Sequence, residues 1–564
     1  MPPDKNPHVP QVSITISGNS LPPEIMALLY SVEVENSLYL PSMFTLRFYD
    51  DDFAIIDNPI IELGRPISIE LGSGVTPTLT KVFTGEITAL EPEFSEDAVA
   101  VFVVRGYDLR HRLNQTHTQT FLNTTDTDIV KKLIGAAGII PGKIDATGVV
   151  HEHIYQDNQS DLAFIQMLAL RNSFELAVSE TGTLDFRKIS PNPTEIQLKW
   201  RETLRSFRPR LSLAEQVKTV EVRSWDRVTK KPIVASNPTT SFVAKIGGAQ
   251  EASKGFGYPQ SKTLETHTPV TSAREASNIA SAMAQQAGAS FAEAEGLAIG
   301  EPTLLPGVKV NILDIGTRFG GAYIVSSTRH RYDSFGYDTY FSVEGTQPQQ
   351  VADLVSGTTQ RRARWYGVVP AIVTNNTDPK KMNRVKIKIP TLTEDHETNW
   401  APVVAPGAGA TRGIEWLPEV NDEVLVAFQD GDINFPYVLG GMWNGKDTPL
   451  SPAAVEGADV VLRTLQSKKG HIFRMIDRNS GGLKAGLQLV DSSGKNKIII
   501  NTTDNKIEII SQGDILVTAV KNLTLKATGN VDISGQNVKV AAQTVLELTA
   551  TGQTTLKGSV VNIN

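Results

Sequence analysis

Two histidines separated by one residue are the strongest candidates for metal chemistry in the sequence. His151 and His153 flank Glu152 in a stretch that reads as a strand, and alternate residues of a strand share one face. Zinc sites use three or four protein ligands, and the sequence offers no evident third ligand beside this pair. We therefore expect a structural role for both histidines and no metal site.

Two further segments contain the residue types of ligand sites but not their spacing. Gly407–Gly413 is rich in glycine, yet it does not connect a strand to a helix as a nucleotide-binding loop does, so we expect a plain loop. Asp50–Asp52 has the charge to hold a cation but lacks the ligand spacing of a calcium loop. This acidic run is expected to be a turn.

The sequence contains no recognisable catalytic motif. We find no Gly-x-Ser-x-Gly elbow, no HExxH and no P-loop pattern. The absence of cysteine excludes disulfides, thiolate zinc sites and cysteine catalysis. We expect a protein that is not an enzyme and that holds no cofactor and no metal.

Length and composition indicate a large multidomain globular protein. A chain of 564 residues exceeds a single core and suggests about three or four domains. Its net charge of −7 argues against a chain built as a whole to bind nucleic acid. The first residues lack the apolar core of a secretion signal, and no apolar run approaches the roughly 20 residues of a spanning helix.

The alternation of apolar and polar residues predicts a chain made mainly of β-strands with a few helices. Residues 11–110 alternate apolar and polar side chains as strands do. Helices are expected at 126–137, with Asp126 or Asp128 as the cap, at 160–171 and at 272–286. A segment rich in Gln, Ser, Gly and Thr follows residue 346, and residues 365–445 suggest a small barrel of the OB type.

The most informative pattern is a C-terminal repeat with a period of about eight residues. Pairs of aliphatic residues with one residue between them recur, separated by Gly, Asn, Asp and Ser. A fixed period this short is typical of a fibrous array. The pairs are Ile507 and Ile509, Ile515 and Val517, Leu523 and Leu525, Val531 and Ile533, Val538 and Val540, Leu546 and Leu548, a weaker Thr554 and Leu556, and Val561 and Ile563.

The period also predicts the number of chains. A one-chain β-helix needs about 18–24 residues per turn to enclose a core. One octad supplies only a strand and a corner, whereas three chains together supply about 24 residues per turn. We infer an intertwined homotrimer whose core consists of the aliphatic pairs from Ile507 to Leu548. An antiparallel meander with exposed polar faces is the alternative.

Several motifs resemble one known family. Asn375–Pro379, Asn383–Ile387, Leu417–Phe428 and Pro436–Gly440 are similar to the OB domain of VgrG-type hub and spike proteins of contractile injection systems. Asn383 and Asn421 replace two glycines of that pattern, and Asn tolerates the same left-handed conformation. Tyr155–Ile165 and the segments Gly300–Pro302, Pro306–Gly307, Tyr323 and His330 resemble the upstream hub of the same family.

The resemblance implies an architecture and a set of partners. It divides the chain into phage-tail-hub-like domains with two β-barrels at 1–350, a linker at 351–364, an OB fold at 365–450 and a β-helix needle at 451–564. The expected trimer would dock on a hexameric inner tube, lie among baseplate proteins and touch a target membrane transiently. It would be made in the bacterial cytoplasm without a signal peptide.

The resemblance also implies a tip partner at the end of the needle. In the family a small PAAR-type protein caps the β-helix. The last turn of this chain carries apolar residues without a polar cap. We expect the tip protein to bind Val560, Val561, Asn562, Ile563 and Asn564.

Two other classes of function stay open at this stage. A carbohydrate-binding trimeric tail fibre or adhesin is the first, because OB barrels can bind sugars and Trp365, Tyr366, Trp400, Trp416 and Trp443 gather in the OB region. A cell-wall hydrolase is the second, and no motif supports it. The sequence does not identify the phage, secretion system or extracellular particle to which the spike belongs.

Overall fold

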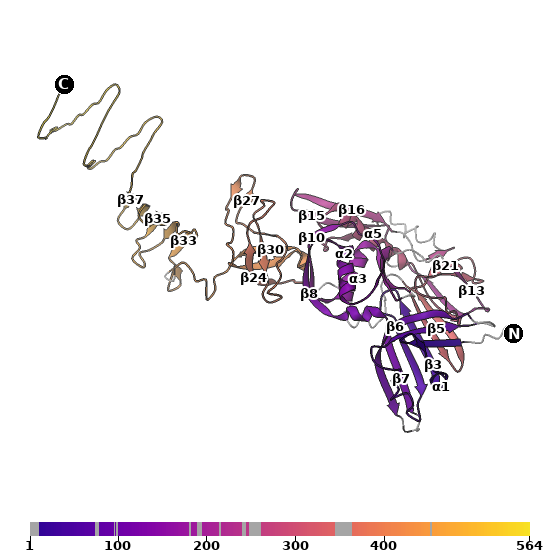
Figure 1. Ribbon diagram of the computed structural model, residues 1–564. Coiled ribbons are helices and arrows are strands. Elements are labelled where there is room, and N and C mark those ends of the chain that lie inside the picture. The colour runs from indigo at the N-terminus through magenta and orange to yellow at the C-terminus, as the bar shows by residue number, and fades with distance from the viewer. Residues whose placement is uncertain are drawn as a thin grey trace. The chain divides into compact units, whose positions relative to one another are not determined.

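The computed structural model describes residues 11–73, 78–94, 96, 100–179, 182–188, 195–213, 216–239, 244–247, 261–344, 364–451 and 454–563. Over these residues the protein is mainly β-structure with a few helices, which confirms the predicted fold class. The chain divides into two compact units, Met1–Asn444 and Gly445–Asn564 (Figure 1). Of the predicted linker 351–364, only Arg364 lies within the described residues.

One antiparallel sheet organises the first unit. Among the described residues this sheet contains eleven strands, which come from both the beginning and the end of the segment 11–343. The strands, in spatial order, are β14 (Leu204–Leu211), β19 (Ala292–Ile299), β23 (Gly336–Val343), β22 (Ser327–Asp333), β3 (Leu29–Ser37), β4 (Met43–Tyr49), β7 (Ala100–Tyr107), β6 (Thr80–Phe94), β5 (Pro66–Gly72), β1 (Gln11–Ile16) and β2 (Asn19–Ser20).

The two ends of this sheet bury separate cores and form the barrel-like halves expected of the hub. Alternating residues of β4, including Phe44, Leu46 and Phe48, are buried in the first core beside the short helix α1 (Pro23–Met26). Tyr323 and Phe341 belong to the second core. That core is covered by β13 (Glu195–Lys199), β20 (Lys309–Leu313), β21 (Gly321–Ile324) and β17 (Ala244–Ile246).

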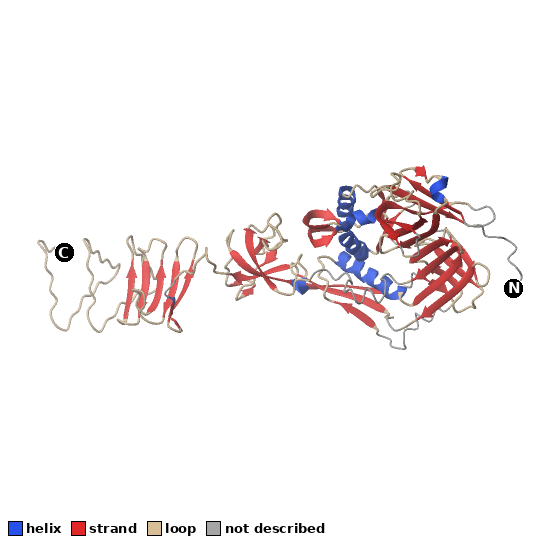
Figure 2. Ribbon diagram, turned by 90° about the horizontal axis from the view of Figure 1, so that it is seen from below, coloured by secondary structure: helices blue, strands red, loops and turns tan. Residues whose placement is uncertain are grey.

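Three helices and several small sheets are inserted between strands of the large sheet (Figure 2). The helices are α2 (Asp126–Ala136), α3 (Asp161–Asn172) and α5 (Ala273–Ala289), within a few residues of the predicted ranges. The sheets pair β10 (Val150–Ser160) with β8 (Thr116–Thr125), β11 (Phe174–Val178) with β12 (Leu184–Lys188) and β9 (Pro141–Ile144), and β16 (Lys231–Pro238) with β15 (Thr219–Asp226) and β18 (Lys262–Glu265). A 3-10 helix spans Leu109–Asn114.

The cap predicted for α2 is wrong. Thr125, not Asp126 or Asp128, is the N-cap, and its hydroxyl accepts from the Asp128 backbone N–H. A hydroxyl in this position satisfies one of the free N–H groups of the first turn. Asp126 is buried instead, with 1% of its surface exposed, which leaves its carboxylate available for a tertiary network.

Residues 368–441 form the OB barrel. Its sheet has the order β26 (Ala401–Pro402), β25 (Arg384–Lys388), β24 (Val368–Asn375), β29 (Glu423–Phe428) and β30 (Pro436–Gly441), and a bridge between Val403 and Val438 closes it. A 3-10 turn spans Gln429–Gly431. Asn383 and Asn421 adopt φ values of 53° and 78°, so both take the left-handed conformation expected where the family pattern has glycine.

The second unit begins as an antiparallel meander. After the hairpin of β31 (Val455–Glu456) and β32 (Asp459–Val460), five strands pair in sequence order. They are β33 (Leu462–Gln466), β34 (Ile472–Ile476), β35 (Gly486–Val490), β36 (Lys497–Asn501) and β37 (Lys506–Ile510). Among the described residues 511–563 no strand is formed within the chain, and Figure 2 shows this segment as loops beyond the meander.

A buried ion pair in the first unit allows a test of how the hub is held together. Arg110 Nη2 lies 2.7 Å from Asp108 Oδ2, with side-chain exposures of 3% and 2%. The same guanidinium donates to the carbonyls of Leu176 and Ser37, and Asp108 accepts from the Ser42 N–H. The pair therefore connects residues that are distant in sequence.

We expect Arg110→Met to lower the free energy of unfolding by about 3–5 kcal/mol, because it leaves a buried carboxylate unpaired. Chemical denaturation of the full chain, followed by far-UV circular dichroism, measures the change. The control is Arg65→Met, which removes an exposed pair with Glu62 and should cost less than about 1 kcal/mol. Equal losses in the two variants would contradict this role of Arg110.

Candidate functional site

The meander presents one face made almost entirely of apolar side chains. Residues paired directly across antiparallel strands point to the same side, so the register gives two rows across the sheet. The first row is Leu465, Phe473, Leu489, Ile498 and Ile509, and the second is Arg463, Met475, Leu487, Ile500 and Ile507. We call these two rows the apolar face.

The apolar face is exposed within one chain. Leu489, Ile498 and Ile500 are 49%, 42% and 39% exposed, and Ile507 is 70% exposed. Nine large apolar side chains gathered on one sheet face exceed the scattered exposure that is normal for a monomer. A contiguous exposed face of this kind indicates a contact with another polypeptide.

The structure places the predicted needle residues on this face and beyond it. Ile507 and Ile509 lie on β37. The other ten lie after the last strand, and all are more than half exposed: Ile515, Val517, Leu523, Leu525, Val531, Ile533, Val538, Val540, Leu546 and Leu548. Among the predicted tip residues Val560, Val561 and Ile563 are exposed as well, Asn562 is exposed, and Asn564 lies outside the described residues.

Sequence reasoning missed the upstream part of the apolar face. The pairs Leu487 and Leu489, and Ile498 and Ile500, have the same one-residue gap as the octads. Their starts lie eleven and nine residues before the next pair, because the turns between meander strands vary in length. A search for alternating aliphatic pairs without a fixed period would have found them.

The other candidates take structural roles. The Asp50 carboxylate accepts from the backbone N–H groups of Ile55 and Ile56, so the acidic run is a turn, as expected. Gly407–Gly413 contains the hairpin of β27 (Ala408–Gly409) and β28 (Arg412–Gly413). Within the described part of the chain, no group of three or more His, Asp or Glu side chains is arranged to hold a metal ion.

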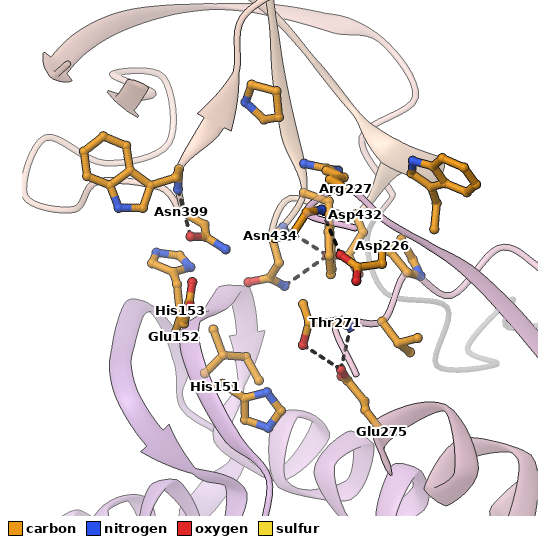
Figure 3. A pocket seen from close by; sticks show the side chains of 18 of the residues that line it. His151, Glu152, His153, Asp226, Arg227, Thr271, Glu275, Asn399, Asp432 and Asn434 are labelled. Carbon is orange, nitrogen blue, oxygen red and sulfur yellow. Dashed lines mark hydrogen bonds between the residues drawn. The ribbon is translucent and has the colours of Figure 1, made fainter. Parts of the chain in front are cut away.

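His151 and His153 line a cavity of about 290 Å³ between the helical insertion and the OB barrel. Both are buried. His153 lies beside Asn399 at the cavity, whereas His151 lies deeper, toward the helices (Figure 3). The two side chains therefore have different neighbours and do not converge on one ligand.

His151 belongs to a buried ionic network. Its Nε2 lies 3.0 Å from Asp126 Oδ1, and Arg171 Nε lies 3.3 Å from Asp126 Oδ2. Arg171 also approaches Glu275 at 3.6 Å. Burial raises the pKa of Asp126, but Arg171 and His151 outweigh it, so the pKa of this carboxyl lies below its usual range. The network joins β10, α2, α3 and α5.

The aromatic residues of the OB region are engaged in different ways. The Trp365 indole N–H donates to Asp157 Oδ2 at 2.5 Å, and its ring contacts Phe428. Arg384 and Lys386 lie over the Trp400 ring. Tyr366, Trp416 and Trp443 are exposed. The Tyr366 hydroxyl also accepts from Arg364 at 3.0 Å, so three of the five residues proposed for sugar stacking have partners within the protein.

No described helix has the length and apolar character needed to cross a membrane.

Family comparisons match two adjacent regions. Residues 6–334 match the Alg8 N-terminal domain. Residues 369–443 match the type VI secretion system and phage-baseplate injector OB domain. None of the curated proteins compared with the chain matches it.

Solved structures share the fold at low sequence identity. A chain of the half-lidded Francisella PdpA–VgrG complex is 11% identical with a TM-score of 0.51, covering 89% of this chain and 88% of that one. A chain of the lidless PdpA–VgrG complex is 11% identical with a TM-score of 0.52, covering 90% and 99%. An E. coli type VI secretion component similar to T4 phage tail proteins gp27 and gp5 is 16% identical with a TM-score of 0.47, covering 76% and 99%.

The resemblance read from the sequence motifs is therefore confirmed at the level of the fold. The match to the Alg8 model covers more than half of the chain, and the match to the injector OB domain lies downstream of it. The protein belongs to the family of the Alg8 N-terminal domain, carries the injector OB domain of type VI secretion systems and phage baseplates, and has the fold of VgrG-type hub and spike proteins.

Proposed function

We propose that the protein is a homotrimeric hub and spike at the centre of the baseplate of a contractile injection system. The observation that carries this proposal is the apolar face of the second unit, which one chain exposes from β33 to β37 and continues in the octads. Its role is structural and not enzymatic. The hub half links the inner tube to the spike, and the spike pierces the target envelope mechanically.

Two further copies of the chain are the partners that fit the apolar face. Three octads supply about the number of residues that one turn of a β-helix needs, and three equivalent faces would meet around one axis. Each aliphatic side chain buried in this way contributes roughly 1.5–3 kcal/mol. With many such residues per chain, the assembled shaft would be very stable.

The backbone of residues 511–563 requires the same partners. In the single chain this described segment forms no strand ladder, so its N–H and C=O groups lack sheet partners. Such groups are strongly driven to pair, and free strand edges are rarely left open. Hydrogen bonds between three chains would satisfy them and stiffen the shaft, which is the property a piercing spike needs.

The remaining partners follow from the family resemblance. The hub would contact a hexameric inner tube protein and other baseplate proteins, and the shaft would touch a target membrane transiently. The Francisella VgrG occurs in a complex with PdpA, which is a precedent for further proteins binding around such a spike. At the far end, the exposed Val560, Val561 and Ile563, with Asn562 and Asn564, would bind a PAAR-type tip protein.

The trimer can be tested with charges placed on the two opposite faces of the same strand pair. Leu489 and Ile498 face each other on the apolar face, and Gln488 and Ile499 face each other on the other side. Native mass spectrometry of the wild-type chain should give about 184 kDa, three times 61.3 kDa. Leu489→Lys with Ile498→Lys should lower the guanidinium chloride concentration at which this species dissociates, because six charges enter the core.

Gln488→Lys with Ile499→Lys is the matched control and should leave the dissociation midpoint close to the wild-type value. A monomeric wild-type chain would overturn the proposal. Equal midpoints for the two double variants would show that the apolar face is not the contact between chains.

The tip contact gives a second test. A chain that ends after Gly552 lacks the last turn, so it should no longer retain a purified PAAR-type tip protein in a pull-down while remaining at the mass of a shortened trimer. Val561→Asp with Ile563→Asp in the full chain should have the same effect, because charge replaces the apolar end. Full retention of the tip protein by both variants would refute this binding site.

A further inference from the structure

The OB barrel is held against β10 by a small set of side chains, which we call the junction. The Tyr155 backbone N–H donates to Asn434 Oδ1 at 2.8 Å, and the Tyr155 side chain packs into the OB core. His153 Nε2 lies 3.0 Å from the Glu397 carbonyl oxygen. Trp365 completes the junction by donating to Asp157.

His153 is held at the junction in its neutral form. Because its Nε2 faces a carbonyl oxygen, that nitrogen carries the proton. The opposite nitrogen, Nδ1, is buried and has no hydrogen-bond partner among the described residues. Protonation of Nδ1 would bury a positive charge, which is costly, and a hydrogen bond with the Asn434 side chain offsets only part of that cost.

The charged groups around His153 do not offset that cost. Lys386 on β25 adds a repelling positive charge. The Glu397 carboxylate, which would attract a proton, is shared with Lys386 at 3.7 Å and with the Thr374 hydroxyl. Glu152, which precedes His153 on β10, is paired with Lys380 at 2.5 Å. The Asn434 side chain accepts from the Tyr155 N–H and donates to Asp432.

Two other histidines take part in contacts between the barrel and the rest of the first unit. His267 Nδ1 lies 3.3 Å from Asp430 Oδ1. Its side chain is 68% exposed, so solvent screens the pair. His396 Nδ1 lies 3.5 Å from the Thr120 hydroxyl, a contact at the limit of hydrogen bonding. Of the three histidines, only His153 is buried.

We propose that this junction is an acid-sensitive joint, which holds the OB barrel on β10 at neutral pH and releases it when the surroundings acidify. The proposal concerns the contact between two parts of one chain. It goes beyond the hub-and-spike role and does not depend on the trimer.

The direction and size of the response follow from proton linkage. Burial, reinforced by Lys386, lowers the pKa of His153 from 6.5 to about 4, although the Glu397 carbonyl opposes the shift. The released form therefore binds the proton more tightly than the docked form. The equilibrium constant for docking of the barrel on β10 is largest above about pH 6.5, falls as the pH drops below that value and levels off near pH 4. At pH 5 it should be lower by on the order of 30-fold.

Hydrogen exchange at the Tyr155 amide measures opening of the joint in the full chain, because this N–H donates across the junction. Its protection factor, corrected for the intrinsic pH dependence of exchange, should be about 30-fold lower at pH 5 than at pH 7.5. The Leu21 amide is the internal reference. Leu21 is buried in the first core, and its N–H donates to the Ile14 carbonyl oxygen at 2.9 Å, so its protection reports on the hub without involving a buried histidine.

His153→Gln should remove the response, since the amide can donate to Glu397 but does not titrate. His267→Gln is the matched control and should keep the wild-type response. The proposal is overturned if the wild-type protection factor of Tyr155 does not fall relative to that of Leu21, or if the protection factor of Tyr155 in His153→Gln falls as much as in the wild type.

Lys386→Met tests the same joint without altering His153. Removal of the repelling charge frees Glu397 to stabilise the protonated ring, so the loss of protection between pH 7.5 and 5 should be smaller than in the wild type. If the His153→Gln variant does not form the junction at pH 7.5, Lys386→Met is the variant that tests whether the junction opens in acid. An unchanged or larger loss in Lys386→Met would then refute the proposal.

Discussion

The apolar face of the second unit is the constraint on which the rest of the interpretation depends. A sheet buries its apolar side against another layer, and the large sheet of the first unit does so with its own strands and helices. The meander and the octads have no second layer within the chain, and their aliphatic residues remain exposed. A single chain therefore leaves this layer incomplete, and in the proposed trimer two further copies would complete it.

The change from meander to octads has a physical basis in the spacing of the aliphatic pairs. Where the pairs are nine or eleven residues apart, the intervening turns are long enough for the chain to fold back on itself, as Leu489 and Ile498 do. Where successive pairs start eight residues apart, the chain has room only for one strand and a short corner. The described chain makes its last hairpin between β36 and β37, close to where the octad period begins. The length of the gaps thus decides whether a strand finds its partner within the chain.

Much of the fold could be predicted from the sequence because it rests on local patterns. The periodicity of Ile129, Val130, Leu133 and Ile134 places α2, and the tolerance of Asn for positive φ preserves the turns at Asn383 and Asn421. The cap of α2 was predicted wrongly because Thr125, Asp126 and Asp128 all offer a side-chain oxygen at the start of the helix, and Asp126 is engaged in tertiary contacts instead. The junction could not be predicted, since Tyr155 and Asn434 are 279 residues apart and neither carries a local signal.

The junction shows what the segment Tyr155–Ile165, which resembles the hub of the family, does in the fold. Tyr155 completes the core of the OB barrel, Asp157 accepts from Trp365, and Gln156 donates to Asp161 at the start of α3. One short stretch thus connects the β8–β10 pair, the helical insertion and the barrel. In the proposed spike the shaft is braced by hydrogen bonds between chains along its length, whereas the barrel is joined to β10 by a few side chains. His153 is one of the side chains that bridge β10 and the barrel, so a change in its protonation acts directly on the contact between them.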